Sequence, residues 1–399
     1  MRSALVFDPL SAEFRANSLA VYRRFLREDP VHRIAAGSWL ICRHRDVYKV
    51  LIDTVNVRRS YEFSVQRVPE GPFREFQRYN LVAMNPPQHT RLRGVLAQAF
   101  SPARIRQLSE SVDAVAERLL ARLEAKSSGD MSAELAFPLP IEVICTMLGI
   151  PAQDQQMFRE QGAALISGLE RTSTPDEQQR AADASATLFA YLSEIAAARQ
   201  REPGDDLISV LVAHQAAGDM THEEVVFTGA VLLLAGHETT THLIGNGIAA
   251  LIEHPGEFQR LAREPERVAN AVQEFLRYDP SIFAIFRDCT AELTFGDVTV
   301  PAGSRMTLAL AAANRDPEVF QNPDTLDIAR PNASRHLSFA GGIHLCLGQA
   351  LARIESQIVF RKLVEKFSSL SFDGTPERRR GLTFNGYDRL PVTWTRRAA

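Results

Sequence analysis

One buried helix constrains the fold of this chain more than any other stretch. Residues 225–236 are almost continuously apolar, and a helical pattern continues from there to Glu253. Thr221 and Glu224 have the spacing of a capping box, which predicts that the helix begins there. At a rise of about 1.5 Å per residue it is about 50 Å long, enough to cross a whole domain. Because the apolar run is too short to span a membrane, it requires a large protein core around it.

A polar run, residues 237–242, interrupts this apolar helix. Polar side chains in a buried helix are costly unless they have partners. Ala235 and Gly236 remove bulk just before the run, and the Thr239 hydroxyl can bond back to the Ala235 carbonyl and open the helix. These features predict a small groove with Glu238 and Thr239 at its edge. The same residues also fit a stretch where the helix reaches solvent, and the local pattern favours neither.

A second stretch presents a single cysteine. The glycine-rich segment 338–345 leads to Cys346, at the start of a predicted helix that ends near Phe367. Backbone N–H groups and the helix dipole favour a thiolate at such a place. No Cys or His stands at zinc spacing from it, so a lone thiolate suits an axial haem ligand better than a tetrahedral metal site. A lone cysteine is also compatible with a small buried hydrophobe.

The rest of the chain predicts a mainly α protein with small β-sheets (α+β). Helical periodicity recurs at 12–28, 104–124 and 268–278, and short strand patterns occur at 31–42 and 282–310. Residues 56–83 mix aromatic, charged, Pro and Gly residues without a clean period, which predicts an irregular lid over a pocket, with a loosely packed surface loop as the alternative. A polar break at 172–175 is a second candidate lid.

Two charged pairs have helical spacing. His89 and Arg93 share one helical face after a Pro-Pro helix start, so they form either a solvated surface or a grip for an anion such as a haem propionate. Glu274 and Arg277 can pair on one face, and on local sequence alone this is typical of a surface ion pair.

Composition narrows the class of protein. The chain has 399 residues, 45% of them hydrophobic, and a formal net charge of -3. This charge gives no reason to expect nucleic acid or an anionic membrane as a partner. The four cysteines are widely spaced, and the N-terminal apolar run is too short for a signal peptide or anchor, so we expect a cytoplasmic protein without disulfides.

The pattern Phe339-x-x-Gly342-x-His344-x-Cys346-x-Gly348 resembles the haem-binding signature of the cytochrome P-450 monooxygenases. Ala235-Gly236-His237-Glu238-Thr239-Thr240 is similar to the oxygen-activation motif of that family, and Glu274-x-x-Arg277 with Arg330 is similar to its ion cluster. The segment 86–93 resembles the propionate-binding helix of soluble bacterial members. The resemblance covers nearly the whole chain. It implies a single domain over 1–399, with haem between the long central helix and the cysteine-loop helix.

The resemblance also implies residue roles. Cys346 would be the iron ligand, Phe339 would pack beside it, and Gly342 and Gly348 would let the backbone approach haem b and the sulfur. The haem propionates would be held by four cations: His89, Arg93, Arg287 and His336. Glu238 and Thr239 would relay protons during oxygen activation, next to Ala235 and Gly236. Two departures from the family pattern are Glu238, where Asp is frequent, and Ala340, where Gly is common.

The implied reaction inserts one atom of O2 into a hydrophobic small molecule, such as a polyketide, terpenoid or peptide intermediate. No flavin- or nicotinamide-binding domain is recognisable, so electrons would come from a separate ferredoxin and its reductase, and we expect a monomer. Four basic residues are candidates for the docking face, although any one of them can simply be solvated: Arg104, Arg353, Arg361 and Lys362.

Three alternatives remain open at this point. The first is fatty-acid hydroxylation. The second is a peroxide-driven haem-thiolate enzyme, against which the Glu238-Thr239 pair argues. The third is a non-catalytic haem sensor, which would need the thiolate but not the proton relay.

Overall fold

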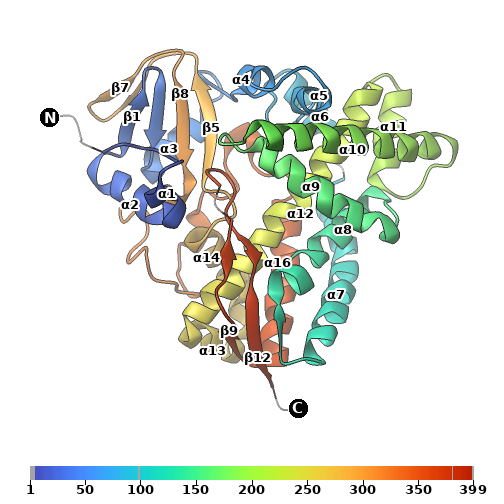
Figure 1. Cartoon of the computed structure of the whole chain (residues 1–399), viewed down its shortest axis with the longest axis vertical. Helices are drawn as coiled ribbons and strands as arrows, with labels where there is room; N and C mark the ends of the chain where they lie inside the picture. The colour runs from blue at the N-terminus through green and yellow to red at the C-terminus, as the bar shows by residue number, and fades with distance from the viewer. Residues whose placement is uncertain (1–4, 98, 380, 398–399) are drawn as a thin grey trace. The chain divides into compact units, whose positions relative to one another are not determined.

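The computed structural model describes residues 5–97, 99–379 and 381–397. Helices dominate and the β-sheets are small, as predicted (Figure 1). Contacts divide the chain into two compact units. The first comprises Met1–Arg58, Asp113–Ala136 and Thr239–Ala399, and the second comprises Arg59–Val112 and Phe137–Glu238. The single domain over 1–399 stays a prediction. Within the described residues, no helix is both long and apolar enough to cross a membrane.

The first unit contains all the strands of the described residues. Its α-helices are α1 (Ala12–Ala16), α2 (Ser18–Glu28), α3 (His44–Ile52), α13 (Pro255–Arg263), α14 (Val268–Tyr278), α15 (Leu310–Ala313) and α16 (Gln349–Lys366). Its strands are β1 (Val31–Ala35), β2 (Ser38–Ile41), β3 (Val57–Arg58), β4 (Ser128–Asp130), β5 (Ala284–Cys289), β6 (Leu293–Phe295), β7 (Val298–Val300), β8 (Arg305–Ala309), β9 (Phe367–Phe372), β10 (Glu377–Arg378), β11 (Tyr387–Arg389) and β12 (Pro391–Arg396).

A five-stranded sheet organises the N-terminal part of this unit, in the order β1-β2-β8-β5-β3. The strand pattern predicted at 31–42 is confirmed: β1 and β2 form an antiparallel hairpin, and Gly37 turns between them with a φ of 69°, a conformation that glycine adopts without strain. Strand β8 pairs with β2 in parallel and with β5 antiparallel. A second sheet has the order β4-β12-β9, and its strand β9 contacts α13 and α16 (Figure 1).

The second unit is helical. Its helices are α4 (Tyr61–Gln66), α5 (Pro72–Arg78), α6 (Gln88–Ala97), α8 (Pro138–Leu148), α9 (Gln155–Leu169), α10 (Pro175–Arg201) and α11 (Leu207–Ala216). Helices α7 (Pro102–Glu124) and α12 (His222–Glu253) run through the division between the units.

The segment 56–83 differs from the irregular loop that was predicted. It contains β3 and the helices α4 and α5, and both Phe73 and Phe76 are buried. These phenylalanines lie three apart on one helical face, and Pro72 occupies the first turn of α5, where proline is tolerated. The prolines and glycine therefore mark a helix start in this segment. A role as a lid stays a prediction.

The long helix begins where its capping box predicted. The backbone N–H of Thr221 donates to Glu224 Oε2 at 3.0 Å, and the Glu224 N–H donates to Thr221 Oγ1 at 3.2 Å. Both donors belong to the first turn, where helix N–H groups have no partner inside the helix. Local sequence is thus enough to determine the start of α12.

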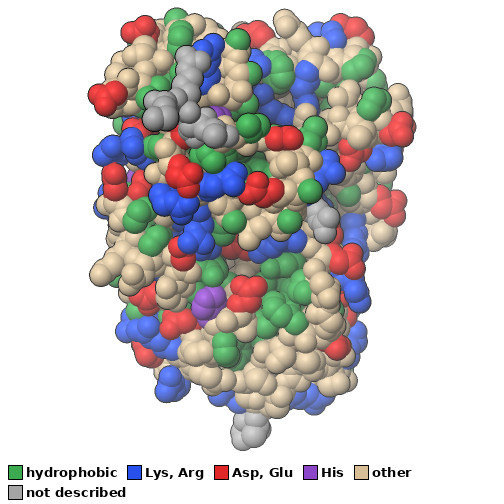
Figure 2. Space-filling view, turned by 60° about the vertical axis from the view of Figure 1, so that its left-hand side comes forward, with side chains coloured by type: hydrophobic (Ala, Val, Ile, Leu, Met, Phe, Trp, Pro, Cys, Tyr) green, Lys and Arg blue, Asp and Glu red, His purple; other side chains and the backbone are tan. Residues whose placement is uncertain are grey.

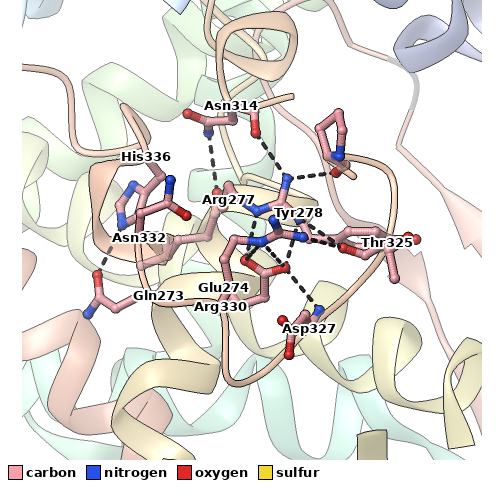
Figure 3. Close-up of polar contacts among 12 residues, drawn as sticks. Gln273, Glu274, Arg277, Tyr278, Asn314, Thr325, Asp327, Arg330, Asn332 and His336 are labelled. Carbon is pink, nitrogen blue, oxygen red and sulfur yellow. Dashed lines mark hydrogen bonds and ion pairs between the residues drawn. The ribbon is translucent and has the colours of Figure 1, made fainter. Parts of the chain in front are cut away.

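The Glu274–Arg277 pair is buried, so its interpretation as a surface ion pair was wrong. Both side chains are 0% exposed, and Arg277 Nε lies 2.7 Å from Glu274 Oε2. Arg330 completes the cluster, 3.0 Å from Glu274 Oε1 (Figure 3). The remaining Arg277 nitrogens donate to the carbonyls of Asn314, Pro323 and Thr325. Buried charges are tolerated when they are paired and hydrogen-bonded in this way.

The same cluster leads to the cysteine loop. Asn314 donates to Ser338 Oγ at 2.8 Å and accepts from the Leu337 N–H at 2.7 Å. Ser338 in turn donates to the Leu276 carbonyl on α14 at 2.6 Å. Helix α14 therefore holds the beginning of the loop that carries Cys346.

Candidate functional site

The predicted site residues are divided between the two units. The first unit holds Thr239, Arg287, His336, Phe339, Gly342, Cys346 and Gly348, and the second holds His89, Arg93, Ala235, Gly236 and Glu238.

The cysteine loop folds back on itself. The Cys346 N–H donates to the Phe339 carbonyl at 2.9 Å, and Gly348 is the N-cap residue of α16. Gly342 has a φ of 62°, and a Cβ there would lie 2.5 Å from the Leu51 carbonyl oxygen, so only glycine fits. Ala340 also has a positive φ, 58°, which is strained for alanine. The common family glycine at position 340 therefore has a backbone explanation.

Arg353 on α16 lies against this loop. Its guanidinium is 4.6 Å from the centroid of the Phe339 ring. Burial lowers the pKa of Arg353, and the charge of Cys346 acts in the opposite direction. A cation this close to the sulfur favours the thiolate. Arg353 therefore belongs to the environment of Cys346, a role that the sequence did not predict.

His336 is held within the first unit by both ring nitrogens. Nδ1 accepts from the Ser338 N–H at 3.1 Å, so Nε2 carries the proton that faces Gln273 Oε1, also at 3.1 Å. Burial and the positive charges of Arg353 and Arg277 lower the pKa of His336 to about 3. The ring is thus neutral at physiological pH. Arg287 on β5 is also buried, and its Nη1 donates to the Phe286 carbonyl at 2.8 Å.

Thr239 is connected to a buried polar network in the first unit. Ser281 Oγ donates to the Thr239 carbonyl at 2.7 Å. Further along α12, Asn246 donates to the Asp279 carbonyl at 2.9 Å, and Asn385 donates to Asp279 Oδ1 at 2.9 Å. These bonds join α12 to the segment after α14 and to the C-terminal turn before β11. Sequence analysis missed Ser281 because a single serine after a helix end carries no motif.

In the second unit, three basic residues lie close enough to interact electrostatically: His89 and Arg93 on α6, and Arg59. His89 is buried, and the positive charges of Arg93 and Arg59 add to burial in lowering its pKa to about 4. Burial lowers the pKa of Arg59 to about 10. Within the part of the chain that the structure describes, no acceptor is bonded to the Arg59 guanidinium. The guanidinium groups of Arg59 and Arg93 beside the neutral His89 ring fit the carboxylate of a haem propionate.

Arg59 is a second residue that sequence analysis missed. It precedes the α4 helix and is 26 positions from Asn85, whose side chain accepts from the Arg59 backbone N–H at 2.8 Å. That bond brings Arg59 to the start of α6. The available signal was the Arg58-Arg59 pair next to an aromatic segment, which is too common to indicate a site.

On the second-unit side of α12, small residues allow close packing. A Cβ on Gly236 would lie 3.0 Å from Ile144 Cδ1, so the missing side chain lets α8 approach. Glu238 is buried, and its Oε2 lies 3.3 Å from His237 Nε2. The groove at Ala235 and Gly236 stays a prediction: His237 is 1% exposed, whereas Ala235 is exposed and Gly236 is partly exposed.

Two of the candidate docking cations are engaged in ion pairs. Lys362 lies 3.1 Å from both Asp113 and Glu117, and Arg104 lies 3.0 Å from Asp205. On the face shown in Figure 2, Lys and Arg side chains are interspersed with Asp and Glu side chains. Such a surface fits the small net charge and does not form a continuous positive field.

Comparisons with known proteins agree on one family. The family described as "Cytochrome P450" matches residues 36–381. The chain is 36% identical to cytochrome P450 107B1 of Saccharopolyspora erythraea, with 97% of each protein covered. It is 33% identical to the polyketide biosynthesis cytochrome P450 PksS of Bacillus subtilis, with 98% of each covered.

A solved structure gives the same result. P450BioI, in complex with an acyl carrier protein ligated to hexadec-9Z-enoic acid, has a TM-score of 0.90 at 30% identity. The alignment covers 96% of this chain and 100% of that one. Coverage of whole chains excludes a shared subdomain as the source of the similarity.

Proposed function

This chain belongs to the cytochrome P450 family and is a P450 monooxygenase, and we propose that it hydroxylates a hydrophobic specialised metabolite, with a polyketide as the first candidate. The observation that carries the substrate class is the full-length similarity to PksS, whose name assigns it to polyketide biosynthesis. Terpenoids and peptides are the further members of the class.

We propose haem b as the cofactor and Cys346 as its iron ligand. When bound, haem supplies the oxygen activation that the amino acids cannot provide. Arg353 stabilises the negative sulfur from one side, and the Phe339 ring shields that region. Gly342 and Gly348 give the loop the turns that it needs to present Cys346. The propionates would be held by His89, Arg93, Arg287 and His336, and Arg59 would join them.

Glu238 and Thr239 would hold and deliver protons, next to the small residues Ala235 and Gly236. Glu238 is supported by its burial beside His237, with Oε2 3.3 Å from His237 Nε2. Thr239 is supported by the Ser281 bond to its carbonyl, which fixes the helix at this position. The acid–hydroxyl pair disfavours both the peroxide-driven enzyme and the haem sensor.

Electrons would come from a ferredoxin and a ferredoxin reductase, and the protein would act as a cytoplasmic monomer. Arg353 is less available for docking than Arg361, because its guanidinium packs on Phe339. The docking face therefore depends more on Arg361 than the sequence alone suggested.

The central test is spectroscopic. Reduced protein with carbon monoxide should show the red-shifted Soret band of thiolate ligation, and Cys346→Ala should abolish it. Cys289→Ala, which removes a different cysteine that is buried, is the matched control and should leave the band in place. An unshifted band in the wild-type protein would contradict the assignment of Cys346.

A carrier-bound fatty acyl chain is the second candidate substrate. It is favoured by the similarity to P450BioI, which was solved with a ligated acyl carrier protein. Free and carrier-tethered forms of the same polyketide and fatty acyl chains should be compared by the spin-state shift and by product formation. A response to tethered acyl chains alone would favour the second candidate over the first.

A further inference from the structure

His237 belongs to the predicted oxygen-activation motif, but the sequence suggested no role for it, and its surroundings are unusual. It is 1% exposed, in the middle of α12. Its Nδ1 lies 3.2 Å from the Leu233 carbonyl, one helical turn back. A carbonyl only accepts, so Nδ1 carries a proton and Nε2 is the nitrogen that can gain or lose one.

That second nitrogen faces the candidate proton carrier. Nε2 lies 3.3 Å from Glu238 Oε2, and both side chains are almost fully buried. The contact is close enough for an ion pair but is not aligned as a hydrogen bond, and Nε2 has no hydrogen-bond partner within the described residues. An isolated buried carboxylate or imidazolium is costly, whereas a pair that shares one proton is not. The two side chains therefore form one buried pair.

The packing around His237 fixes the ring. A Cβ on Gly162 of α9 would come within 3.2 Å of His237 Cε1, so the glycine makes room for the imidazole. The Phe137 ring packs against it edge to face, with centroids 5.1 Å apart. On the other side of Phe137 lies the exposed Arg159, whose guanidinium is 4.7 Å from the ring centroid. Within the described residues, Arg159 is the only charged side chain with a recorded contact to the Phe137 ring.

We propose that His237 is a positioning residue that supplies protons to Glu238. The imidazolium Nε2–H transfers its proton to Oε2, which leaves a neutral imidazole and a protonated carboxyl. After Glu238 has released that proton toward Thr239, a hydronium ion from solvent gives one proton to Nε2 and leaves as water. No electrons move, and solvent replaces the proton on His237. This inference rests on the proposed function, in which Glu238 delivers protons.

His254, the first residue after the end of α12, offers a matched control. Its Nδ1 makes the same contact to the carbonyl one turn back, 2.9 Å from Ala250, but it has no ion pair with an acid within the described residues. The difference between His237 and His254 is therefore the carboxyl partner, and not the bond to the helix.

Three variants of the haem-loaded protein test the inference: His237→Gln, His237→Asn and His254→Gln. Neither Gln nor Asn can carry a proton, but Asn keeps a donor near Leu233 and Gln keeps a polar group near Glu238. We expect both His237 variants to lose about tenfold in product formed per O2 consumed, with a matching rise in hydrogen peroxide and an increased solvent isotope effect. Substrate affinity and the carbon monoxide band should not change, and His254→Gln should behave as wild type.

A readout independent of turnover is the infrared band of the Glu238 carboxyl in the resting protein, assigned by its loss in Glu238→Gln. The frequency of this carboxyl band should shift in both His237 variants and should be unchanged in His254→Gln. An unchanged band together with full coupling in His237→Gln would overturn the inference and leave His237 as packing. Failure of the proposed function is distinguishable, because Glu238→Gln would then remain fully coupled.

Discussion

Two groups of basic residues, one in each unit, differ in their electrostatic surroundings. Arg277 and Arg330 share Glu274, and their remaining N–H groups reach backbone carbonyls. In the second group, the charges of Arg93 and Arg59 both act against protonation of His89. The carboxylate of Glu274 balances charge in the first group, whereas the second group has a positive potential that favours an anion.

The difference separates scaffold from site. A buried ion cluster that satisfies its own hydrogen bonds contributes a unique packing arrangement. Basic residues that oppose one another's protonation lower the stability of the fold and persist where function needs them. This comparison gives three predictions, from the largest expected effect to the smallest.

The largest effect is expected at Glu274. Glu274→Gln removes the negative charge between two buried guanidinium groups, so the free energy of unfolding should fall by about 3–5 kcal/mol. Denaturant unfolding measures this fall, and Glu274→Asp, which keeps the charge, should lose less. Arg389→Gln is the control, because its ion pair with Glu377 is more than half exposed. It should change stability by less than about 1 kcal/mol. Equal losses in Glu274→Gln and Arg389→Gln would contradict the comparison.

An intermediate effect is expected from acid. The pKa of His89 is about 4 in the folded chain because of burial, Arg93 and Arg59, against about 6.5 in an unfolded chain. The unfolded state therefore binds more protons between these values, and stability is lost as the pH falls from about 6.5 toward 4. Because of His89, the free energy of unfolding of haem-free protein should be about 2 kcal/mol lower at pH 5 than at pH 7.

His89→Gln should remove that part of the acid sensitivity, as measured by unfolding at the two pH values. The buried His336 remains in this variant and retains its own acid sensitivity, because its pKa of about 3 is also lowered. If the stability of His89→Gln differed between pH 5 and pH 7 as much as that of wild type, the lowered pKa of His89 would not be a cause of the acid sensitivity.

The smallest effect on stability is expected at Arg59. Arg59→Met removes a partly buried charge whose guanidinium has no acceptor within the described residues, so haem-free protein should keep its free energy of unfolding within about 1 kcal/mol. Haem retention should nevertheless weaken by about tenfold, because one cation facing a carboxylate is lost. Absorbance titration with haem measures the affinity. The neighbouring Arg58→Met, at an exposed arginine, should leave affinity unchanged, and equal effects of the two variants would argue against Arg59 as a haem contact.

Sequence reasoning succeeded where the signal is local. The Thr221–Glu224 capping box, the β1–β2 hairpin and the α6 start after two prolines all formed as predicted, because their contacts lie within a few residues. It was incorrect for segment 56–83, where Pro72 starts a helix. It also failed for Glu274–Arg277, because local spacing shows that two side chains can pair but not whether they are buried.

By itself, the sequence determined the family, the thiolate candidate Cys346 and the start of the long helix, since each depends on motif spacing or on neighbours in the chain. The tertiary structure decided which charges are compensated. Glu274 and Arg277 are fully buried, Arg59 adds its charge to that of α6, and Gly162 makes room for His237 beside Glu238. Burial and charge pairing depend on groups that approach from distant parts of the chain, and no local pattern records that approach.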